Sequence, residues 1–526
     1  MGETDELAAA FPGHPRVDLG GRTVLPGIVD SHIHLAAYGI ALRRVDLSEA
    51  GSLREAVSAV GAAAARERPE RWILGRGWDK NVWPEDRFPS AADLDPVSPA
   101  NPVALSSKDG HLLWVNGRAL RLAGVTPQTP DPPGGEIARD DRGVPTGILK
   151  EESAKALVGN VIPPADIQTV ERGIREGTAR LHRMGITGVH SFVGTESYEG
   201  DRVFGVLQQL AARGNLSLRV CATLPLGVLD AAASGLRTGS GTEWLRVGPV
   251  KVFADGTLGS QTASMLEPFD GLPANTGIAI HGREELAAIV RQAVAAGWWC
   301  AIHAIGDRAN RWVLDAYEAN ADATRRLGAR HRIEHVQLLH PDDLPRLARL
   351  GVTASMQPIH ATSDRDIADR YWGRRSRTAY AWRSLLRVGT ILAFGSDAPV
   401  ETPDPWQGIY AAVTRRGAAE HRTAWYPEEA LTIEEAVRSY TVGAAWASGE
   451  EQLKGTLSYG RLADFIVLDR DVMSEPPEAL LEVKVLATFV GGRPVFVADP
   501  LRGIASALEG VPDGRPGIRA QGRKSH

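Results

Sequence analysis

The stretch LPGIVDSHIH, residues 25–34, sets the interpretation of the whole chain. An apolar run ends there in the residues DSHIH. If residues 29–34 close a strand, its side chains alternate between two faces, so His32 and His34 project from the same face. Two imidazoles on one face at the end of an apolar strand can bind one metal ion. Because a His-x-His motif is short, two unrelated histidines beside a turn would give the same pattern.

The composition is that of an ordinary globular protein. The chain has 526 residues, 43% hydrophobic and 23% charged, so a large barrel with an appended domain fits its length. A formal net charge of -5 argues against a nucleic-acid surface. Only Cys221 and Cys300 are present, which excludes a disulfide framework and a cysteine-based zinc site and favours a cytoplasmic location. No apolar segment approaches the roughly 18 to 20 residues of a membrane span.

Short apolar strands alternate with helical segments from about residue 166 onward. This alternation predicts a parallel sheet whose strands are buried on both faces. Together with the histidine strand there are eight such units, which favours a (β/α)8 TIM-like barrel. The alternative, an open doubly wound sheet, lacks a Gly-rich dinucleotide loop. The seven further predicted strands lie at 185–192, 216–224, 247–256, 298–307, 331–337, 351–360 and 391–400.

Both ends of the chain are predicted to build a small β-sandwich domain. Alternating apolar strands with Gly turns occupy the C-terminal part, and strand-like pieces around Val17 and Val24 are expected to pair with them. The predicted domains are therefore 1–24 with 450–526 for the β domain and 25–449 for the barrel. A Trp-rich, Pro/Gly-rich region at about 70–165 is expected to be a folded insertion after the first barrel strand, rather than a linker.

Residues that can bind metal fall near the C-terminal ends of several predicted strands. Besides the two histidines of the first strand, these are Lys251, His303, His335 and Asp397, in the fourth, fifth, sixth and eighth strands. Each alone could be a packed, hydrogen-bonded or turn residue. A barrel brings its strand ends together at one mouth, where barrel active sites lie. Such an N/O-rich set suits Zn, Fe, Mn or Ni.

Six motifs together resemble the metal-dependent amidohydrolase superfamily: DSHIH, VKVFADGTLGS, HAIGDRAN, RIEHVQ, SMQPIH and GSDAPV. They are most similar to its amidohydrolase 3 (YtcJ-like) branch, which includes N-substituted formamide deformylases, and the resemblance covers essentially the whole chain. It implies that His32, His34 and Asp397 bind one metal ion. It also implies a second ion on His303 and His335, with Lys251 carboxylated by carbon dioxide and bridging the two. The expected cofactor is a divalent metal, Zn first, at one or two ions per chain.

The resemblance further implies hydrolysis of a non-peptide C–N bond in an amide, formamide or cyclic amide. The expected reagent is metal-activated hydroxide, with Asp397 as general base and then general acid. An ester or carbamate hydrolase with the same site, or a non-catalytic binding or regulatory homologue, are the alternatives. We expect a small-molecule substrate, neither a nucleic-acid nor a membrane partner, and leave a homodimer open.

Four residues are predicted to contact substrate. His111 and the pair Trp78 and Asp79 lie in the insertion, and His360 is expected to end the seventh strand. Large aromatic side chains at these positions would favour an apolar or aromatic substituent. In the family a longer β segment usually precedes the histidine strand, so we expect a truncated start and an exposed sheet edge in the small β domain.

Overall fold

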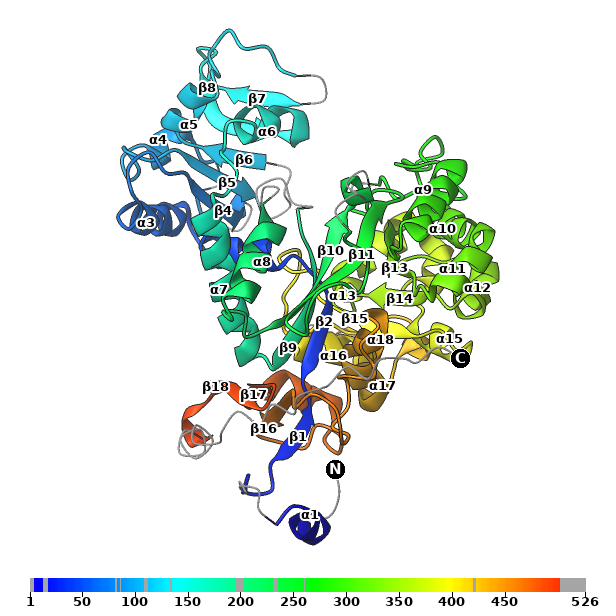
Figure 1. Ribbon diagram of the computed structural model, residues 1–526. Helices are drawn as coiled ribbons and strands as arrows, with labels where there is room; N and C mark the ends of the chain where they lie inside the picture. Colours follow the sequence, from blue (N-terminus) through cyan, green and yellow to red (C-terminus); the bar gives the residue numbers. More distant parts are fainter. Residues whose placement is uncertain are drawn as a thin grey trace. The chain divides into compact units, whose positions relative to one another are not determined.

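The computed structural model of the chain (Figure 1) divides into two compact units. One contains the N-terminal segment through Tyr38 and the chain from Ile174 onward, and the other contains Gly39–Gly173. We describe each unit by itself. The structure describes residues 4–12, 18–80, 83–85, 87–107, 112–132, 135–194, 202–229, 235–259, 261–419 and 422–501.

The first unit is built on eight parallel strands, in the sheet order β15-β14-β13-β12-β11-β10-β9-β2. The two end strands approach each other, because His34 N donates to Ala398 O (2.9 Å) and Asp397 N donates to His32 O (2.6 Å). The eight predicted strands and the barrel are thus confirmed. The strands are β2 (Ile28–Ile33), β9 (Ile186–Phe192), β10 (Arg219–Pro225), β11 (Leu245–Phe253), β12 (Cys300–Ala304), β13 (Arg332–His335), β14 (Thr353–Met356) and β15 (Leu392–Phe394).

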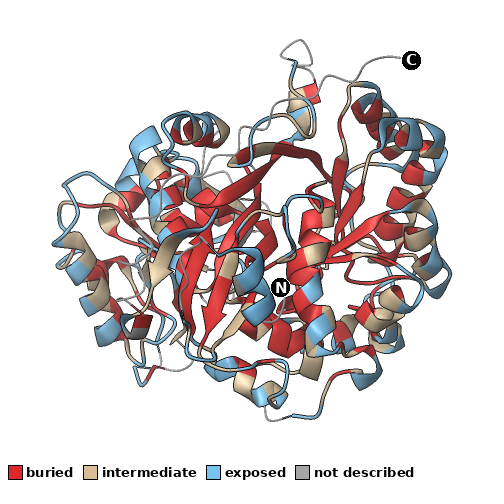
Figure 2. Cartoon of the chain, turned by 60° about the horizontal axis from the view of Figure 1, so that its bottom comes forward, coloured by how far each residue is buried: buried red, intermediate tan, exposed pale blue. Residues whose placement is uncertain are grey.

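The barrel strands are apolar because both of their faces are covered. All six residues of β2 and all seven of β9 are buried. Figure 2 shows this as red strands inside, with helices that turn pale blue residues outward. The helices of this unit are α1 (Thr4–Ala10), α8 (Val203–Ala212), α9 (Arg283–Ala295), α10 (Asp307–Ala319), α11 (Ala321–Leu327), α12 (Leu344–Leu350), α13 (His360–Ser363), α14 (Arg365–Tyr371), α15 (Trp382–Arg387), α16 (Pro405–Thr414), α17 (Ile433–Arg438) and α18 (Ala444–Ala447).

Two further helices, α2 (Leu35–Ala41) and α7 (Ile167–Arg183), cross the boundary between the units. A capping box starts α17, with the Thr432 side chain accepting from Glu435 N. No helix among the described residues has both the length and the hydropathy of a bilayer-crossing segment.

The small β domain is a four-stranded antiparallel sheet in the order β1-β16-β17-β18, for the residues that the structure describes. Strand β1 comes from the N-terminal side and pairs with β16, with Val24 opposite Val467. The predicted pairing of the two chain ends is therefore present at Val24, whereas Val17 lies outside the described residues. The strands are β1 (Thr23–Pro26), β16 (Phe465–Leu468), β17 (Val485–Val490) and β18 (Arg493–Val497).

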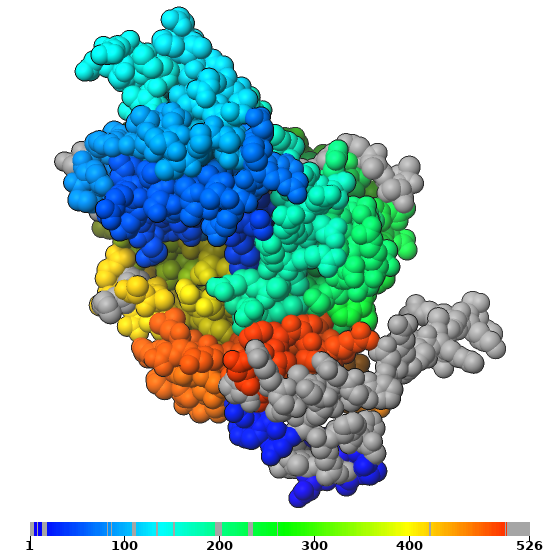
Figure 3. All heavy atoms as spheres, turned by 90° about the vertical axis from the view of Figure 1, so that its left-hand side faces the viewer, coloured from blue at the N-terminus to red at the C-terminus, as the bar shows by residue number. Residues whose placement is uncertain are grey.

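This sheet packs against the barrel. Figure 3 shows the orange and red surface of the C-terminal segments continuing directly onto the green surface of the barrel segments. Thr488 in β17 donates its hydroxyl to His182 O (2.7 Å), and Arg219 in β10 forms a bidentate ion pair with Asp464 just before β16. Sheet and barrel therefore share buried polar contacts.

The second unit is folded around a six-stranded sheet in the order β3-β4-β5-β6-β8-β7. It begins at Gly39, earlier than the predicted insertion, because β3 pairs with β4 and helix α3 contributes buried residues to the same core. The strands are β3 (Val45–Asp46), β4 (Ile73–Trp78), β5 (Val103–Ser107), β6 (Leu112–Val115), β7 (Glu136–Arg139) and β8 (Pro145–Lys150). The helices are α3 (Leu53–Ala64), α4 (Ala91–Leu94), α5 (Gly117–Leu122) and α6 (Glu151–Gly159).

Candidate metal centre

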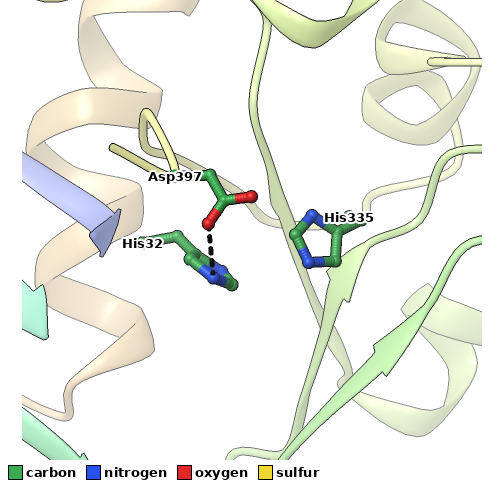
Figure 4. Close-up of side chains that lie close together, drawn as sticks. All are labelled: His32, His335 and Asp397. Carbon is green, nitrogen blue, oxygen red and sulfur yellow. Dashed lines mark ion pairs between the residues drawn. The ribbon is translucent and has the colours of Figure 1, made fainter. Parts of the chain in front are cut away.

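Three buried side chains meet at the C-terminal ends of barrel strands. His32 lies in β2, His335 ends β13, and Asp397 follows β15. One ligand atom from each lies within 4.8 Å of the others, the spacing of a group that could hold a metal ion. Figure 4 shows the two imidazoles and the carboxylate facing a common space, with Asp397 Oδ1 3.4 Å from His32 Nε2.

The other predicted ligands lie beside this group. His34 Nε2 is 3.1 Å from Asp397 Oδ1, and the ring centroid of His303 is 4.6 Å from that of His335. Lys251 is 3% exposed, and its Nζ lies 4.4 Å from the ring centroid of Phe192. The ring of Phe192 in turn stacks on His32 at 3.9 Å between centroids. All six predicted ligand residues are therefore buried around one mouth of the barrel.

Burial keeps the histidines neutral, because a charged imidazole loses its hydration there. This effect lowers the pKa of His32 to about 4 and that of His303 to about 3, and it holds the pKa of His335 well below its usual value. Burial alone would raise the pKa of Asp397, but interactions with His32 and His34 outweigh it and hold the pKa well below its usual range. Near neutral pH the cluster therefore offers imidazole lone pairs and an ionised carboxylate.

Two ligand rings are oriented by a hydrogen bond at Nδ1. His32 Nδ1 donates to Glu334 Oε2 (2.7 Å), and His335 Nδ1 donates to Gln357 Oε1 (2.8 Å). A neutral imidazole that donates through Nδ1 carries its lone pair on Nε2. The acceptors Glu334 and Gln357 therefore fix the tautomer in which Nε2 can bind a metal ion.

Two buried aspartates hold the segments that carry the ligands. Asp30 accepts from the backbone N–H groups of His32 and Ser396, both at 3.0 Å, and ties β2 to the loop that carries Asp397. Asp255 accepts from Ile305 N (3.0 Å), just beyond β12. Burial raises the pKa of each of these two carboxyl groups to about 7. Asp255 is thus placed to orient the segment after His303.

The backbone is strained at the ends of the ligand-bearing segments. His335, Val336 and Asp397 have φ of 76°, 45° and 61°, in the left-handed region. Each such residue costs on the order of 1–3 kcal/mol and persists only where the surroundings enforce it. Strained backbone of this kind is concentrated at functional sites. Here it sets the direction of the side chains of His335 and Asp397.

His360 lies at the same mouth, but in a different element from the one predicted. Strand β14 ends at Met356, and Pro358 follows, so His360 becomes the first residue of α13. The expectation that His360 ends the seventh strand is wrong, because proline cannot donate to a strand ladder. His360 is 8% exposed as a residue, and its Nε2 lies 3.7 Å from Asp397 Oδ2 with no hydrogen-bond partner among the described residues.

The other predicted substrate contacts lie in the second unit. Trp78 is 1% exposed there, donates its indole N–H to Leu105 O (2.8 Å) and packs edge-on against Trp114. These are the contacts of a core residue, so they do not support a substrate role for Trp78. Asp79 is half-buried, and its role stays a prediction. His111 lies outside the described residues.

Sequence reasoning missed Glu334, Gln357, Asp30 and Phe192. A signal was present for two of them, since Asp30 and Glu334 are acidic residues within the apolar strands DSHIH and RIEH. Charges in such strands need buried partners. Nothing in the sequence singled out Phe192 or Gln357.

The chain matches known proteins over most of its length. A family model described as the amidohydrolase family matches residues 16–496. The chain is 34% identical over 492 residues to YtcJ of Bacillus subtilis (strain 168), which covers 92% of this chain and 91% of that protein. It is 31% identical over 510 residues to the N-substituted formamide deformylase of Arthrobacter pascens, covering 93% and 91%. The solved structure of an uncharacterized metal-dependent hydrolase from Pyrococcus furiosus matches with a TM-score of 0.73 at 30% identity, covering 90% of this chain and 92% of that one.

Proposed function

The chain belongs to the amidohydrolase family, and on that basis we propose that it is a metal-dependent hydrolase of a non-peptide C–N bond. The substrate is an amide, a formamide or a cyclic amide. The observation that carries the proposal is the buried group of His32, His335 and Asp397, whose ligand atoms lie within 4.8 Å of one another at the barrel mouth. The C-terminal ends of the strands are where the active sites of such barrels lie.

The residues present fit a divalent metal. Neutral imidazoles and an ionised carboxylate form an N/O donor set suited to Zn, Fe, Mn or Ni, and we take Zn first. We assign His32, His34 and Asp397 to one ion and His303 and His335 to a second, so the group of His32, His335 and Asp397 would contribute ligands to both ions of a two-metal centre. Bound there, a divalent ion would polarise the substrate carbonyl and lower the pKa of water from 15.7 to about 7.

Lys251, carboxylated by carbon dioxide, would supply carbamate oxygens to both ions. The residue is 3% exposed, and its Nζ lies 4.4 Å from the ring centroid of Phe192 and 4.6 Å from that of Phe253. An ammonium group beside divalent cations is repelled, whereas a carbamate supplies anionic oxygen donors. Without this modification the site would hold a single ion.

Asp397 moves the proton in the proposed reaction. Water attacks the carbonyl carbon, and the proton that it loses passes to a carboxylate oxygen of Asp397, which is ionised near neutral pH. The same proton then goes to the leaving nitrogen as the C–N bond breaks. His360 Nε2, buried and 3.7 Å from Asp397 Oδ2, donates to the substrate carbonyl oxygen as negative charge develops on it.

Two other functions remain as alternatives. The same site could cleave an ester or a carbamate, because the attack on the carbonyl carbon is unchanged. A non-catalytic binding protein is disfavoured, since it has no need of a strained, ionised Asp397 among neutral imidazoles. Similarity to an N-substituted formamide deformylase makes N-substituted formamides the first compounds to try.

A hydrolysis screen of zinc-loaded protein tests the proposal. The panel contains N-formyl, N-acyl and cyclic amide compounds beside matched esters and carbamates with the same substituent. We expect turnover of at least one amide-type compound at a higher kcat/KM than its ester partner. Turnover confined to esters or carbamates would move the assignment to the alternative, and no turnover of any compound would contradict a catalytic role.

A further inference from the structure

We propose that Arg332, buried below the metal centre, is a positioning residue that fixes His32 in the orientation and tautomer of a metal ligand. It acts on the ring through Glu334 and on the backbone through Ser31. The inference rests on the proposed function in one respect, since it takes His32 to be a ligand.

The first path runs along one face of β13. Arg332 and Glu334 are two residues apart in this strand, so both side chains project to the same side. The guanidinium binds the carboxylate through two bonds, Nε to Oε1 at 2.5 Å and Nη2 to Oε2 at 3.1 Å. Both side chains are at most 1% exposed. A bidentate pair of this kind holds the carboxylate in one plane.

The pair determines which nitrogen of His32 keeps its lone pair. The guanidinium of Arg332 donates to both oxygens of Glu334, so Glu334 faces His32 as a carboxylate. An ionised carboxylate only accepts hydrogen bonds, so His32 must donate to it through Nδ1. The lone pair therefore lies on Nε2, the nitrogen that is 3.4 Å from Asp397 Oδ1.

The second path reaches the backbone of β2. Arg332 Nη2 donates to the carbonyl oxygen of Ser31 (2.5 Å), the residue directly before His32. The same guanidinium donates to Ser355 Oγ in β14 (2.7 Å) and to His190 Nδ1 in β9 (2.8 Å). Arg332 thus connects strands β2, β9, β13 and β14, and it fixes both the ring of His32 and the backbone that carries it.

A purely structural role for this ion pair is the weaker explanation. Buried ion pairs add little net stability, because desolvation consumes most of the Coulomb gain. The pair of Arg219 and Asp464 provides a matched comparison. It is also bidentate and buried, with Nε to Oδ2 at 2.6 Å and Nη2 to Oδ1 at 2.9 Å, yet among the described residues it contacts none of the six predicted ligands.

The test compares Arg332→Met, Arg332→Lys and Glu334→Gln with the control Arg219→Met. Three properties are measured without substrate: the apparent zinc dissociation constant by chelator competition, the absorption spectrum of the cobalt-loaded protein, and the melting temperature of the metal-free protein. We expect Arg332→Met and Glu334→Gln to weaken zinc binding about 10- to 100-fold and to change the cobalt spectrum. Arg332→Lys should restore part of the affinity. Arg219→Met should lower the melting temperature and leave zinc affinity and spectrum unchanged.

Unchanged zinc affinity and cobalt spectrum in Arg332→Met, or an equal loss of affinity in Arg219→Met, would overturn the inference. If Arg332→Met does not fold, the same measurements on Glu334→Gln decide the matter, because that substitution keeps the size of the side chain. The ¹⁵N shifts of His32 in the metal-free protein separate this inference from the proposed function. A wild type that binds no zinc would contradict the function, while a change of His32 from the Nδ1–H tautomer in the variants would still support the positioning role.

Discussion

Replacing Asp397 by Asn separates proton transfer from folding. Asn is the appropriate substitute because Asp397 has a φ of 61°, a conformation that Asn tolerates as well as Asp. The amide oxygen can still accept from His34 Nε2, now 3.1 Å from Asp397 Oδ1, and the backbone bond from Asp397 N to His32 O is unaffected. The variant loses the negative charge of the carboxylate and, with it, an oxygen that can take a proton. Because Asp397 is also assigned as a metal ligand, activity is compared per bound zinc.

The expected fall in kcat per bound zinc follows from the loss of proton transfer. General acid–base catalysis contributes about 100- to 10,000-fold, so kcat should fall by that factor. At 1.36 kcal/mol per tenfold, the barrier rises by about 3 to 5 kcal/mol. Because the pKa of Asp397 is lowered in the folded protein, its ionised form stabilises the fold above its ordinary pKa of 3.8, and this contribution is lost as the pH falls. The Asn variant should therefore melt lower at neutral pH while remaining folded.

The assay is the initial rate on the best amide-type compound, with zinc content and melting temperature measured on the same preparation. Asp343→Asn is the matched control, because Asp343 is also a buried aspartate but pairs with Arg311 and Arg346. It should lose stability without losing kcat per bound zinc. An Asp397→Asn variant that retains full kcat per bound zinc would refute the proton-transfer role.

Three further substitutions test other groups in the barrel. His360→Phe should lower kcat about 100-fold at unchanged zinc content, measured by initial rates and metal analysis, because it removes a donor to the carbonyl oxygen; an unchanged kcat would exclude that contact. Burial lowers the pKa of His331 from 6.5 to about 3, so the unfolded chain binds more protons and stability is lost as the pH falls from about 6.5 to about 3. His331→Asn should therefore reduce the acid-induced loss of unfolding free energy by about 2 kcal/mol at pH 5, measured by denaturant titrations of metal-free protein. An unchanged dependence of the unfolding free energy on pH would count against this expectation. Gly395→Ala should weaken zinc binding in a chelator competition, because its Cβ would lie 2.4 Å from His32 N and 2.7 Å from Asp30 Oδ1, whereas Gly205→Ala, with no atom within 4 Å, should not.

The barrel and the location of its site were predicted mainly from the alternation within strands and from the polar residues at strand ends. Alternation in DSHIH placed His32 and His34 together, and the rule that barrel sites lie at the C-terminal strand ends placed His303, His335 and Asp397 at one mouth. These inferences use only local pattern and one topological rule. They hold because buried parallel strands leave few alternatives for where a polar side chain can point.

The features that the sequence did not predict depend on contacts between segments far apart in the chain. The two-residue strand β3 has no periodicity of its own, so the early start of the second unit became visible only through its pairing with β4. The sequence RIEH places Arg332 and Glu334 on one face, but their partners His32, Ser355 and His190 lie on other strands and follow from barrel closure. Such cross-barrel partners leave no local signal.

Metal-dependent hydrolysis is tested most directly by the metal content and activity of one preparation carried through chelation and reloading. We expect one or two divalent ions per chain in the purified protein, loss of amide hydrolysis in proportion to the metal removed, and its return on addition of zinc. Hydrolysis that persists in fully metal-free protein would contradict a metal-dependent mechanism, and zinc-loaded protein that leaves every amide, formamide and cyclic amide intact would contradict the assigned reaction.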